Sequence, residues 1–389
     1  MAVSIRLAHV ITGLGGGGAE FMLARLCAAL PHAEYQVQVI SLTSGGPLAA
    51  QLRAQGITVV ELGLRGVLDV LRGVWALRSA LRAFKPDLVQ TWLCHADLLG
   101  GLVARLSLRV PVIWGVHQAD IATHGTPATT RAVLRACAWL ADKVPARVVS
   151  CSESGRRARI AAGFPAELFE VITNGVDLER FTPDPSAAAS LRRELHVAAG
   201  TLLVGMPARW HSDKDHATLC AAAALVLAAR PDTCFILCGE GIDDDNVELM
   251  RLIAGSGRAD AFRLLGFRAD MGQVLAALDV GVLSSRTEAF PNVIVETMAC
   301  AVPFVATAVG DVAAIIGDAG RVVAAGDAAA LAGALLDILR ASPAQRLALA
   351  QRARQRAVAH FSLATAVARY MAVYRGVLGR SGAAPCAAS

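Results

Sequence analysis

The sequence has 389 residues, of which 55% are hydrophobic and 18% charged, and its formal net charge is +5. This length exceeds what one ordinary core serves, so we expect two domains of about 150 to 200 residues in a globular protein. No run of about 18 apolar residues is present, which excludes a predicted transmembrane helix. The nine cysteines form no C-x-x-C pair, and the first residues lack a signal-peptide pattern, so we expect a cytoplasmic protein without a zinc site.

Short apolar runs alternate with helical patterns through the first part of the chain. This alternation is typical of a parallel sheet with helices on both faces. The predicted strands are 5–12, 36–43, 86–92, 111–117 and 146–152.

Residues 64–87 form a basic helical pattern between two of these strands. The first 180 residues hold 18 Lys and Arg against 13 Asp and Glu, so the excess positive charge lies there. A basic amphipathic helix can rest on an anionic membrane surface, but the same pattern also fits an ordinary solvated helix face, and both interpretations stay open. No basic patch is interleaved with aromatic residues, which argues against a nucleic-acid partner.

The strand and helix alternation starts again after a Pro-, Asp- and Ser-containing segment at about 178–198, which we interpret as a linker. The sequence therefore predicts an α/β protein with two Rossmann-like domains, 1–180 and 181–362, and a C-terminal helix in 363–380 that packs back on the first domain. In such sheets ligands bind at the carboxyl ends of the strands. The predicted strands of the second domain are 202–210, 234–240, 262–267, 279–285 and 303–310.

A glycine-rich loop follows the first strand. Residues 13–18 satisfy G-x-G-x-x-G between a strand and a helix, which is typical of dinucleotide binding. A dehydrogenase would also need an acidic residue after the second strand, but Ser41 and Thr43 stand there. The loop still offers backbone N–H groups at a helix N-terminus, which suit a phosphate or a hydroxylated ligand.

Several polar side chains follow strands at the edge where ligands bind. His117 closes the strand 111–117, and His95 occupies a comparable place after 86–92, so both are candidates. Arg209 and Lys214 follow the strand 202–210, and Lys214 is one of only three lysines in the chain. Two such cations can clamp a diphosphate.

The acidic residues beside Lys214 formally give D-x-D, a pattern that suggests a metal. We instead interpret Asp213 as a helix N-cap and expect the alternating Asp213, Lys214 and Asp215 to neutralise one another. No metal site is therefore predicted.

The stretch 284–307 carries two carboxylates in an otherwise apolar segment. Glu288 lies in a loop beyond the strand 279–285, and Glu296 lies in the helix that follows, on the same face as Asn292. A partly buried carboxylate needs hydrogen-bond donors, which ligand hydroxyls can supply. The backbone N–H groups of Phe290, Asn292 and Val293 suit a sugar or phosphate oxygen.

Taken together, these motifs resemble retaining GT-B glycosyltransferases of family 4. The resemblance covers about residues 5–375 and is carried by the order and spacing of several motifs. They are Glu288-x7-Glu296 in SSRTEAFPNVIVETMACAVPFVATAVGD, Arg209-x4-Lys214, GGGGAE (15–20), SESGRR (152–157), TNGVDLERFTP (173–183) and LLGFRAD (264–270).

The resemblance implies a GT-B fold, with two Rossmann-like domains facing across a cleft, and a nucleoside-diphosphate sugar as donor. It implies that the second domain holds the donor without a metal or other cofactor. Arg209 and Lys214 would bind the diphosphate, Glu288 the sugar hydroxyls and Glu296 the ribose. The remaining implied residues are Phe290, Asn292 and Val293 around the sugar and phosphate, His117 near the reaction centre, Gly16 and Gly17 toward the donor, and Gly18 and Glu20 toward the acceptor.

The resemblance also implies transfer to an acceptor hydroxyl with retention of anomeric configuration. We expect a role in bacterial surface polysaccharide or glycolipid synthesis, with a sugar or lipid-linked saccharide as acceptor and peripheral contact with the inner face of the membrane. Two alternatives remain: a nucleotide-sugar epimerase of the same architecture, and a non-catalytic partner that only binds nucleotide sugars.

This sequence departs from the family pattern at two glycine positions, where it has Ala289 and Ala301. We expect a methyl group at 289 to restrict the loop beside the donor.

Overall fold

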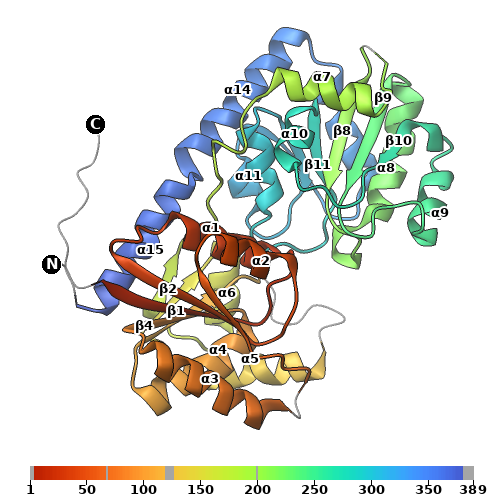
Figure 1. Ribbon diagram of the computed structural model, residues 1–389. Helices are drawn as coiled ribbons and strands as arrows, with labels where there is room; N and C mark the ends of the chain where they lie inside the picture. Colours follow the sequence, from red (N-terminus) through yellow and green to blue (C-terminus); the bar gives the residue numbers. More distant parts are fainter. Residues whose placement is uncertain (1–3, 67–68, 119–126, 199, 380–389) are drawn as a thin grey trace. The chain divides into compact units, whose positions relative to one another are not determined.

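The computed structural model describes residues 4–66, 69–118, 127–198 and 200–379. The chain divides into two compact units (Figure 1): Met1–Gly175 together with Leu363–Ser389, and Val176–Ser362. The boundary lies between 175 and 176 rather than at the predicted 180/181. The C-terminal helix belongs to the first unit, and its predicted last residue, 380, lies outside the described residues.

The first unit contains a seven-stranded parallel sheet with the order β3-β2-β1-β4-β5-β6-β7. The five inner strands were predicted from their apolar runs, whereas the edge strands β3 and β7 were missed. These two are short and only partly buried, so they carry little apolar signal. The strands are β1 Ile5–Ile11, β2 Tyr35–Ser41, β3 Thr58–Glu61, β4 Leu88–Trp92, β5 Val112–Val116, β6 Arg147–Ser150 and β7 Phe169–Val171.

Helices cover both faces of this sheet, because successive residues of a strand point to opposite sides. In β4, Leu88 and Trp92 belong to one apolar core and Val89 to the other. The first core is covered by α1 Gly18–Ala29, α2 Pro47–Ala54 and α15 Leu363–Val377. The second is covered by α3 Val70–Phe84, α4 Cys94–Leu102, the π-helix η2 Val103–Leu108 and α5 Ala128–Leu140 (Figure 1).

Two short elements complete the first unit, α6 Glu153–Ala161 and the 3-10 helix η3 Ala166–Leu168. The helix α6 begins at the predicted motif 152–157, where the side chain of Ser152 accepts a hydrogen bond from the backbone N–H of Gly155. The basic pattern at 64–87 becomes α3, which begins only at Val70.

The second unit contains a six-stranded parallel sheet with the order β10-β9-β8-β11-β12-β13. The sequence predicted five of these strands and missed β13 at the edge. The strands are β8 Leu202–Pro207, β9 Thr233–Cys238, β10 Phe262–Leu264, β11 Val280–Leu283, β12 Phe304–Thr307 and β13 Gly320–Val323.

Most helices of the second unit connect successive strands of its sheet, and two long helices, α13 and α14, follow the last strand. They are α7 Pro185–Glu194, α8 His216–Ala229, α9 Val247–Gly255, α10 Met271–Ala276, α11 Asn292–Ala299, α12 Val312–Ile316, α13 Ala328–Leu339 and α14 Pro343–His360. Two 3-10 turns, η4 Ser212–Lys214 and η5 Ala259–Ala261, complete the set.

The interpretation of 178–198 as a linker was wrong, because α7 lies within it. The side chain of Asp184 caps this helix by accepting hydrogen bonds from the backbone N–H groups of Ser186 and Ala187. Leu191 then packs against Val274 and Ala277. Asp followed by Pro and Ser was therefore the start signal of a packed helix rather than the composition of a linker.

Candidate functional site

In the second unit, the predicted residues follow two neighbouring strands. Arg209 and Lys214 lie after β8, and Glu288 lies after β11, which pairs with β8. The ammonium of Lys214 forms a short ion pair with Glu288 Oε1, and Ser285 Oγ donates to the same oxygen at 2.7 Å. Only 21% of the Lys214 side chain and 11% of the Glu288 side chain are exposed. The structure thus joins two of the predicted residues in one partly buried ion pair.

A hydrogen-bond network fixes the backbone under this ion pair. Ser284 Oγ lies 2.9 Å from the carbonyl oxygens of both Lys214 and Asp215, and it can donate its proton to either. Arg286 donates its backbone N–H to the Asp213 carbonyl at 2.7 Å and its guanidinium Nε to Asp215 Oδ2 at 2.9 Å. The loops after β8 and β11 are therefore bound to each other by residues that the sequence analysis did not select.

Asp215, not Asp213, is the N-cap of α8, so the prediction for Asp213 was wrong. Asp215 accepts hydrogen bonds from the backbone N–H and the hydroxyl of Thr218, and its φ of 49° lies in the left-handed region. Burial acts to raise its pKa, but the hydrogen bonds from Arg286 and Thr218 prevail and lower the pKa below the usual Asp value. The residue that follows Lys214 is thus held as an ionised cap.

Arg209 lies at a hollow of about 380 Å³ that is also lined by Trp210, His211, Glu240 and Gly241. Its side chain is exposed, and its guanidinium forms no hydrogen bond or ion pair within the described part of the chain. Trp210 contacts His216, with 4.9 Å between the ring centres. Burial, and secondarily the charge of Lys214, lowers the pKa of His216 to about 4, so this ring is neutral at pH 7.

The helix that carries Glu296 begins at Asn292, directly after Pro291, as the sequence predicted. Asn292, Val293 and Glu296 have partly exposed side chains on this helix. The Phe290 side chain is instead buried, with its ring 5.8 Å from that of Phe361. Phe290 can therefore offer a ligand only its backbone.

The expected restriction at Ala289 has no counterpart in the backbone. Among the described non-glycine residues with positive φ, Ala301 appears at 57° and Ala289 does not. The strained alanine is therefore the one at 301, just past the end of α11. The loop at 288–289 is confined from another side, because a Cβ on Gly310 would lie 1.9 Å from the Glu288 carbonyl oxygen.

In the first unit, His117 directly follows β5 and stacks on Trp92, with 4.8 Å between the ring centres and an interplanar angle of 17°. Trp92 Nε1 donates to His9 Nδ1 at 3.1 Å. Burial lowers the pKa of His117 to about 4 and that of His9 to about 3, so both rings are neutral at pH 7. Neither ring nitrogen of His117 has a hydrogen-bond partner among the described residues.

The alternative candidate, His95, lies in the first turn of α4. Its Nδ1 is 3.6 Å from Cys94 Sγ, and burial lowers its pKa. His95 thus lies on a different element from His117. Within the described part of the chain, it has no hydrogen bond, ion pair or ring contact with another predicted site residue.

Asp97 is a buried carboxylate that the sequence analysis missed. It accepts hydrogen bonds from Thr91 Oγ1 at 2.5 Å and from the Gly115 backbone N–H at 3.2 Å, and so ties α4 to the strand end that carries His117. Burial raises its pKa to about 7, although Thr91, Gly115 and the charge of Arg159 oppose that rise. A single Asp in an apolar helical pattern gave no signal of this role.

The glycine loop leads directly into α1, and Gly17 is the N-cap residue of this helix. No described glycine in 13–18 has a positive φ, and a Cβ on Gly15 or Gly16 would meet no atom within 4 Å. The carboxylate of Glu20 folds toward the loop, since a Cβ on Gly17 would lie 2.5 Å from Glu20 Oε2. The packing of this unit therefore does not itself require glycine at 15 and 16.

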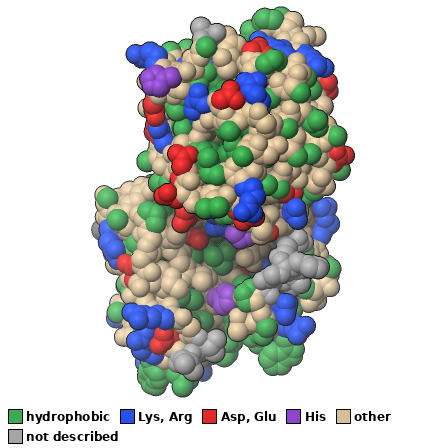
Figure 2. Space-filling view, turned by 90° about the vertical axis from the view of Figure 1, so that its right-hand side faces the viewer, with side chains coloured by type: hydrophobic (Ala, Val, Ile, Leu, Met, Phe, Trp, Pro, Cys, Tyr) green, Lys and Arg blue, Asp and Glu red, His purple; other side chains and the backbone are tan. Residues whose placement is uncertain are grey.

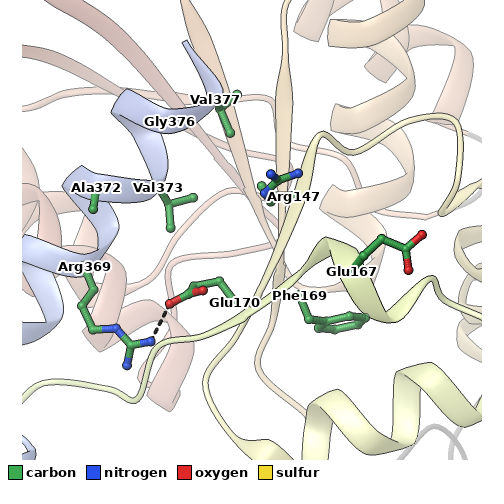
Figure 3. Close-up of a pocket in the computed structure, with 9 residues that line it drawn as sticks. All are labelled: Arg147, Glu167, Phe169, Glu170, Arg369, Ala372, Val373, Gly376 and Val377. Carbon is green, nitrogen blue, oxygen red and sulfur yellow. Dashed lines mark hydrogen bonds and ion pairs between the residues drawn. The ribbon is translucent and has the colours of Figure 1, made fainter. Parts of the chain in front are cut away.

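A larger groove, of about 530 Å³, lies elsewhere in the first unit between the edge strand β7 and α15 (Figure 3). Arg369 of α15 and Glu170 of β7 form an ion pair across it at 2.5 Å. None of the predicted site residues lines it. Its lining consists of Arg147, Glu167, Phe169, Glu170, Arg369, Ala372, Val373, Gly376 and Val377.

No helix among the described residues combines the length and apolar character that crossing a membrane requires. No three His, Cys, Asp or Glu side chains within 4–66, 69–118, 127–198 and 200–379 gather in a way that could hold a metal ion.

Comparison with protein families gives two adjacent matches. Residues 16–180 match the model described as glycosyltransferase family 4, and residues 201–341 match the model described as glycosyl transferases group 1. The first match lies almost wholly in the first unit and includes Gly16–Gly18 of the glycine loop and His117, and the second lies in the second unit and includes Arg209, Lys214 and both glutamates.

Individual relatives agree with these matches. The chain is 26% identical over 314 residues to UDP-Gal:alpha-D-GlcNAc-diphosphoundecaprenol alpha-1,3-galactosyltransferase of Escherichia coli, covering 77% of this chain and 78% of that protein. It is 30% identical over 241 residues to a GDP-mannose-dependent alpha-mannosyltransferase of Mycobacterium tuberculosis, covering 59% and 58%. Among solved structures, Anabaena Alr3699/HepE in complex with UDP-glucose has a TM-score of 0.84 at 25% identity, covering 96% of this chain and 100% of that chain.

Proposed function

Since the chain belongs to the group 1, family 4 glycosyltransferases and has their GT-B fold, we propose that it transfers a sugar from a nucleoside-diphosphate sugar to an acceptor hydroxyl. The observation that carries this proposal is the ion pair of Lys214 with Glu288 in a chain of this family. The donor class is supported by the UDP-glucose complex and by the names of the relatives.

Donor binding follows from the chemistry of the second unit. A diphosphate oxygen would replace Glu288 as the partner of Lys214, and the freed carboxylate of Glu288 would accept hydrogen bonds from sugar hydroxyls. Arg209 would add a second, planar donor to the diphosphate, since its guanidinium has no partner of its own in the described residues. Glu296 would accept from the ribose hydroxyls, and the N–H groups around Phe290, Asn292 and Val293 would face the sugar and phosphate.

The reaction we propose retains the anomeric configuration. The acceptor oxygen forms a bond to the anomeric carbon on the face from which the diphosphate leaves, the bond from that carbon to the diphosphate oxygen breaks, and the acceptor proton passes to the departing diphosphate. Arg209 and Lys214 would stabilise the negative charge that develops on the leaving group, without a metal ion or other cofactor.

The first unit would contribute neutral groups to the same reaction. The neutral ring of His117 has two nitrogens without partners among the described residues, one carrying a proton that it can donate to a sugar oxygen and one able to accept. The backbone of Gly16 and Gly17 would face the donor phosphate, and Gly18 and Glu20 the acceptor.

The acceptor we propose is a sugar or lipid-linked saccharide in bacterial surface polysaccharide or glycolipid synthesis. A relative named for a diphosphoundecaprenol-linked substrate supports this class. Such an acceptor would require the protein to reach the inner face of the membrane, so we include peripheral membrane contact in the proposal.

The test is turnover of a panel of nucleoside-diphosphate sugars with sugar and lipid-linked saccharide acceptors, followed as acceptor-dependent release of the nucleoside diphosphate. We expect release with a matching donor and loss of this release in Lys214→Ala and Glu288→Gln. The anomeric configuration of the product, determined by NMR and compared with that of the donor sugar, decides whether the reaction proceeds with retention. An epimerase would convert the donor into its epimer without transfer to any acceptor. A protein that only binds would stabilise against heat with the donor and release nothing, which would overturn the proposal.

A further inference from the structure

Exposed hydrophobic side chains gather on one layer of the first unit. Ten large hydrophobic residues are exposed among the described residues, and five of them lie on α3, η2 and α5, which cover the same face of the sheet. Both exposed tryptophans are in this group. The five are Val70 at 43%, Leu71 at 78%, Trp75 at 68%, Leu106 at 71% and Trp139 at 71% exposed.

These side chains lie in stripes that also carry positive charge. On α3 the outward stripe runs through Leu71, Trp75, Arg78 and Arg82, with helical spacings of three and four residues. On α5 it runs through Arg131, Arg135 and Trp139 and continues to Lys143, in steps of four. We call the outward surface of α3, η2 and α5 the basic–aromatic face. The sequence-based statement that no basic patch is interleaved with aromatic residues was therefore wrong, because Trp75 and Trp139 lie among these cations.

Each exposed tryptophan lies next to a cation. The guanidinium carbon of Arg78 is 5.6 Å from the centre of the Trp75 ring, and Lys143 Nζ is 4.5 Å from the centre of the Trp139 ring. Between them, Arg105 and Leu106 of η2 are both exposed. Figure 2 shows hydrophobic and basic side chains together at its lower end, where Figure 1 has α3 and α5.

The charge of this face is predominantly positive. The segments 69–109 and 127–143 hold nine Lys and Arg and four Asp, and one of the four, Asp97, is buried. Asp69 lies 3.5 Å from Arg72, and Asp142 lies 4.0 Å from Lys143, so two of the remaining acids are matched by adjacent cations. The face therefore offers cations in excess around exposed indole rings.

We propose that the basic–aromatic face docks on the surface of a bilayer that contains anionic lipids. Indole rings and leucine side chains are favoured at the boundary between headgroups and acyl chains, and arginine and lysine are attracted by anionic headgroups. The combination is unfavourable on a face that meets only water, because exposed apolar area gains nothing there. This inference rests on the membrane contact in the proposed function and names its surface; it does not depend on the donor residues of the second unit.

The experiment is cosedimentation of the full chain with vesicles of phosphatidylcholine, alone or mixed with phosphatidylglycerol. We expect binding to the mixed vesicles that weakens as salt rises. The variants Trp75→Ser with Trp139→Ser, and Arg131→Ala with Arg135→Ala, should each reduce the bound fraction at least about tenfold at limiting lipid.

A matched control is available in the second unit. Val247 and Phe267 are exposed at 71% and 65%, and neither lies on the basic–aromatic face. Val247→Ser with Phe267→Ser should bind vesicles as the parent protein does. The inference is overturned if this control loses as much binding as the face variants, if the face variants bind unchanged, or if light scattering shows that the face instead joins two copies of the chain.

Release of nucleoside diphosphate from the donor, measured with a water-soluble saccharide acceptor and without vesicles, separates this inference from the proposed transferase activity. The face variants should keep the donor turnover of the parent protein, which also shows that they fold. Vesicle binding without any donor turnover would contradict the proposed activity while supporting the docking face, and turnover without vesicle binding would do the reverse.

Discussion

The candidate residues of the two units differ in charge and in hydrogen bonding. In the second unit the groups are charged, and two pairs are already formed, Lys214 with Glu288 and Arg286 with Asp215, whereas the Arg209 guanidinium has no partner among the described residues. In the first unit, His117 is neutral, stacks on Trp92 and lacks a hydrogen-bond partner among the described residues. The second unit therefore suits a charged part of a ligand that can exchange for an internal partner, and the first suits a neutral, hydroxylated part.

The difference also shows in how each site is held. Hydrogen bonds among loop residues, such as those of Ser284 and Asp215, fix the second site. Packing of aromatic rings fixes the first, and part of it comes from the C-terminal helix, whose Tyr370 lies 6.1 Å from Trp92 between ring centres. Changes that remove single polar groups should therefore disturb the second site more than the first.

The largest effect is expected for Lys214→Ala. Loss of the ammonium removes the cation that would stabilise the leaving diphosphate, so donor turnover should fall about 100-fold or more. The readout is nucleoside-diphosphate release under saturating donor. Lys143→Ala removes an exposed lysine of the first unit and should leave this rate unchanged without lipid; equal losses in both variants would contradict the assigned role.

The loop network can be tested at its N-cap. Asp215→Ala removes the cap of α8 and the partner of Arg286, and we expect it to lower the free energy of unfolding by about 1–3 kcal/mol and also to lower donor turnover, because Lys214 is the adjacent residue. Asp184 caps α7 away from this network. Asp184→Ala should lower the stability of the protein to urea by less than Asp215→Ala does and leave turnover intact. If Asp184→Ala lost turnover and Asp215→Ala did not, the role assigned to the loop network would be contradicted.

A pH titration sharpens the contrast at the buried groups. Burial lowers the pKa values of His9, His117 and His216 to about 3, 4 and 4. Between pH 6.5 and 4 these histidines are protonated in the unfolded chain but not in the folded protein. The free energy of unfolding therefore falls on acidification. Asp97, with its pKa raised to about 7, acts in the opposite direction, because only the folded protein protonates it there.

Removing Asp97 should therefore make the acid loss steeper. In Asp97→Asn we expect the free energy of unfolding to fall by about 1.4 kcal/mol more for each pH unit between 6 and 5 than in the parent protein. Asparagine can still accept the hydrogen bonds from Thr91 and Gly115, so the local structure should persist. Unfolding by urea at several pH values measures the slope, and an unchanged or shallower slope would show that Asp97 is ionised in the folded state.

The smallest effect concerns the two alanines that replace glycines. Ala301 has a φ of 57°, so Ala301→Gly should raise the stability of the second unit by up to about 1 kcal/mol. Ala289 has no positive φ, so Ala289→Gly should lower it by about 0.4–1 kcal/mol through the unfolded state. Thermal unfolding of the two variants should shift in opposite directions, and shifts of the same sign would contradict the backbone assignment.

The sequence predicted the inner strands of both sheets because their apolar runs bury both faces. It also predicted the edge strand β10, which lies within the apolar run 262–267. It missed the edge strands β3, β7 and β13, which are short and only partly buried. It predicted Glu288 and Lys214 from their places after strands. It did not find Ser284, Asp215, Arg286 or Asp97, whose partners lie far along the chain and depend on which strands become neighbours. The strain at Ala301 rather than Ala289 likewise depends on a backbone angle that composition does not encode.

The central claim is that the second unit binds a nucleoside-diphosphate sugar through Arg209 and its neighbours. The most direct measurement is the shift in melting temperature with UDP, GDP and their sugars, in the parent protein and in Arg209→Ala, whose guanidinium has no partner among the described residues. The account predicts a saturable stabilisation by at least one of these ligands that is strongly reduced in Arg209→Ala, with equal melting temperatures of the two unliganded proteins. An undiminished shift in Arg209→Ala, or no shift with any of the ligands, would contradict it.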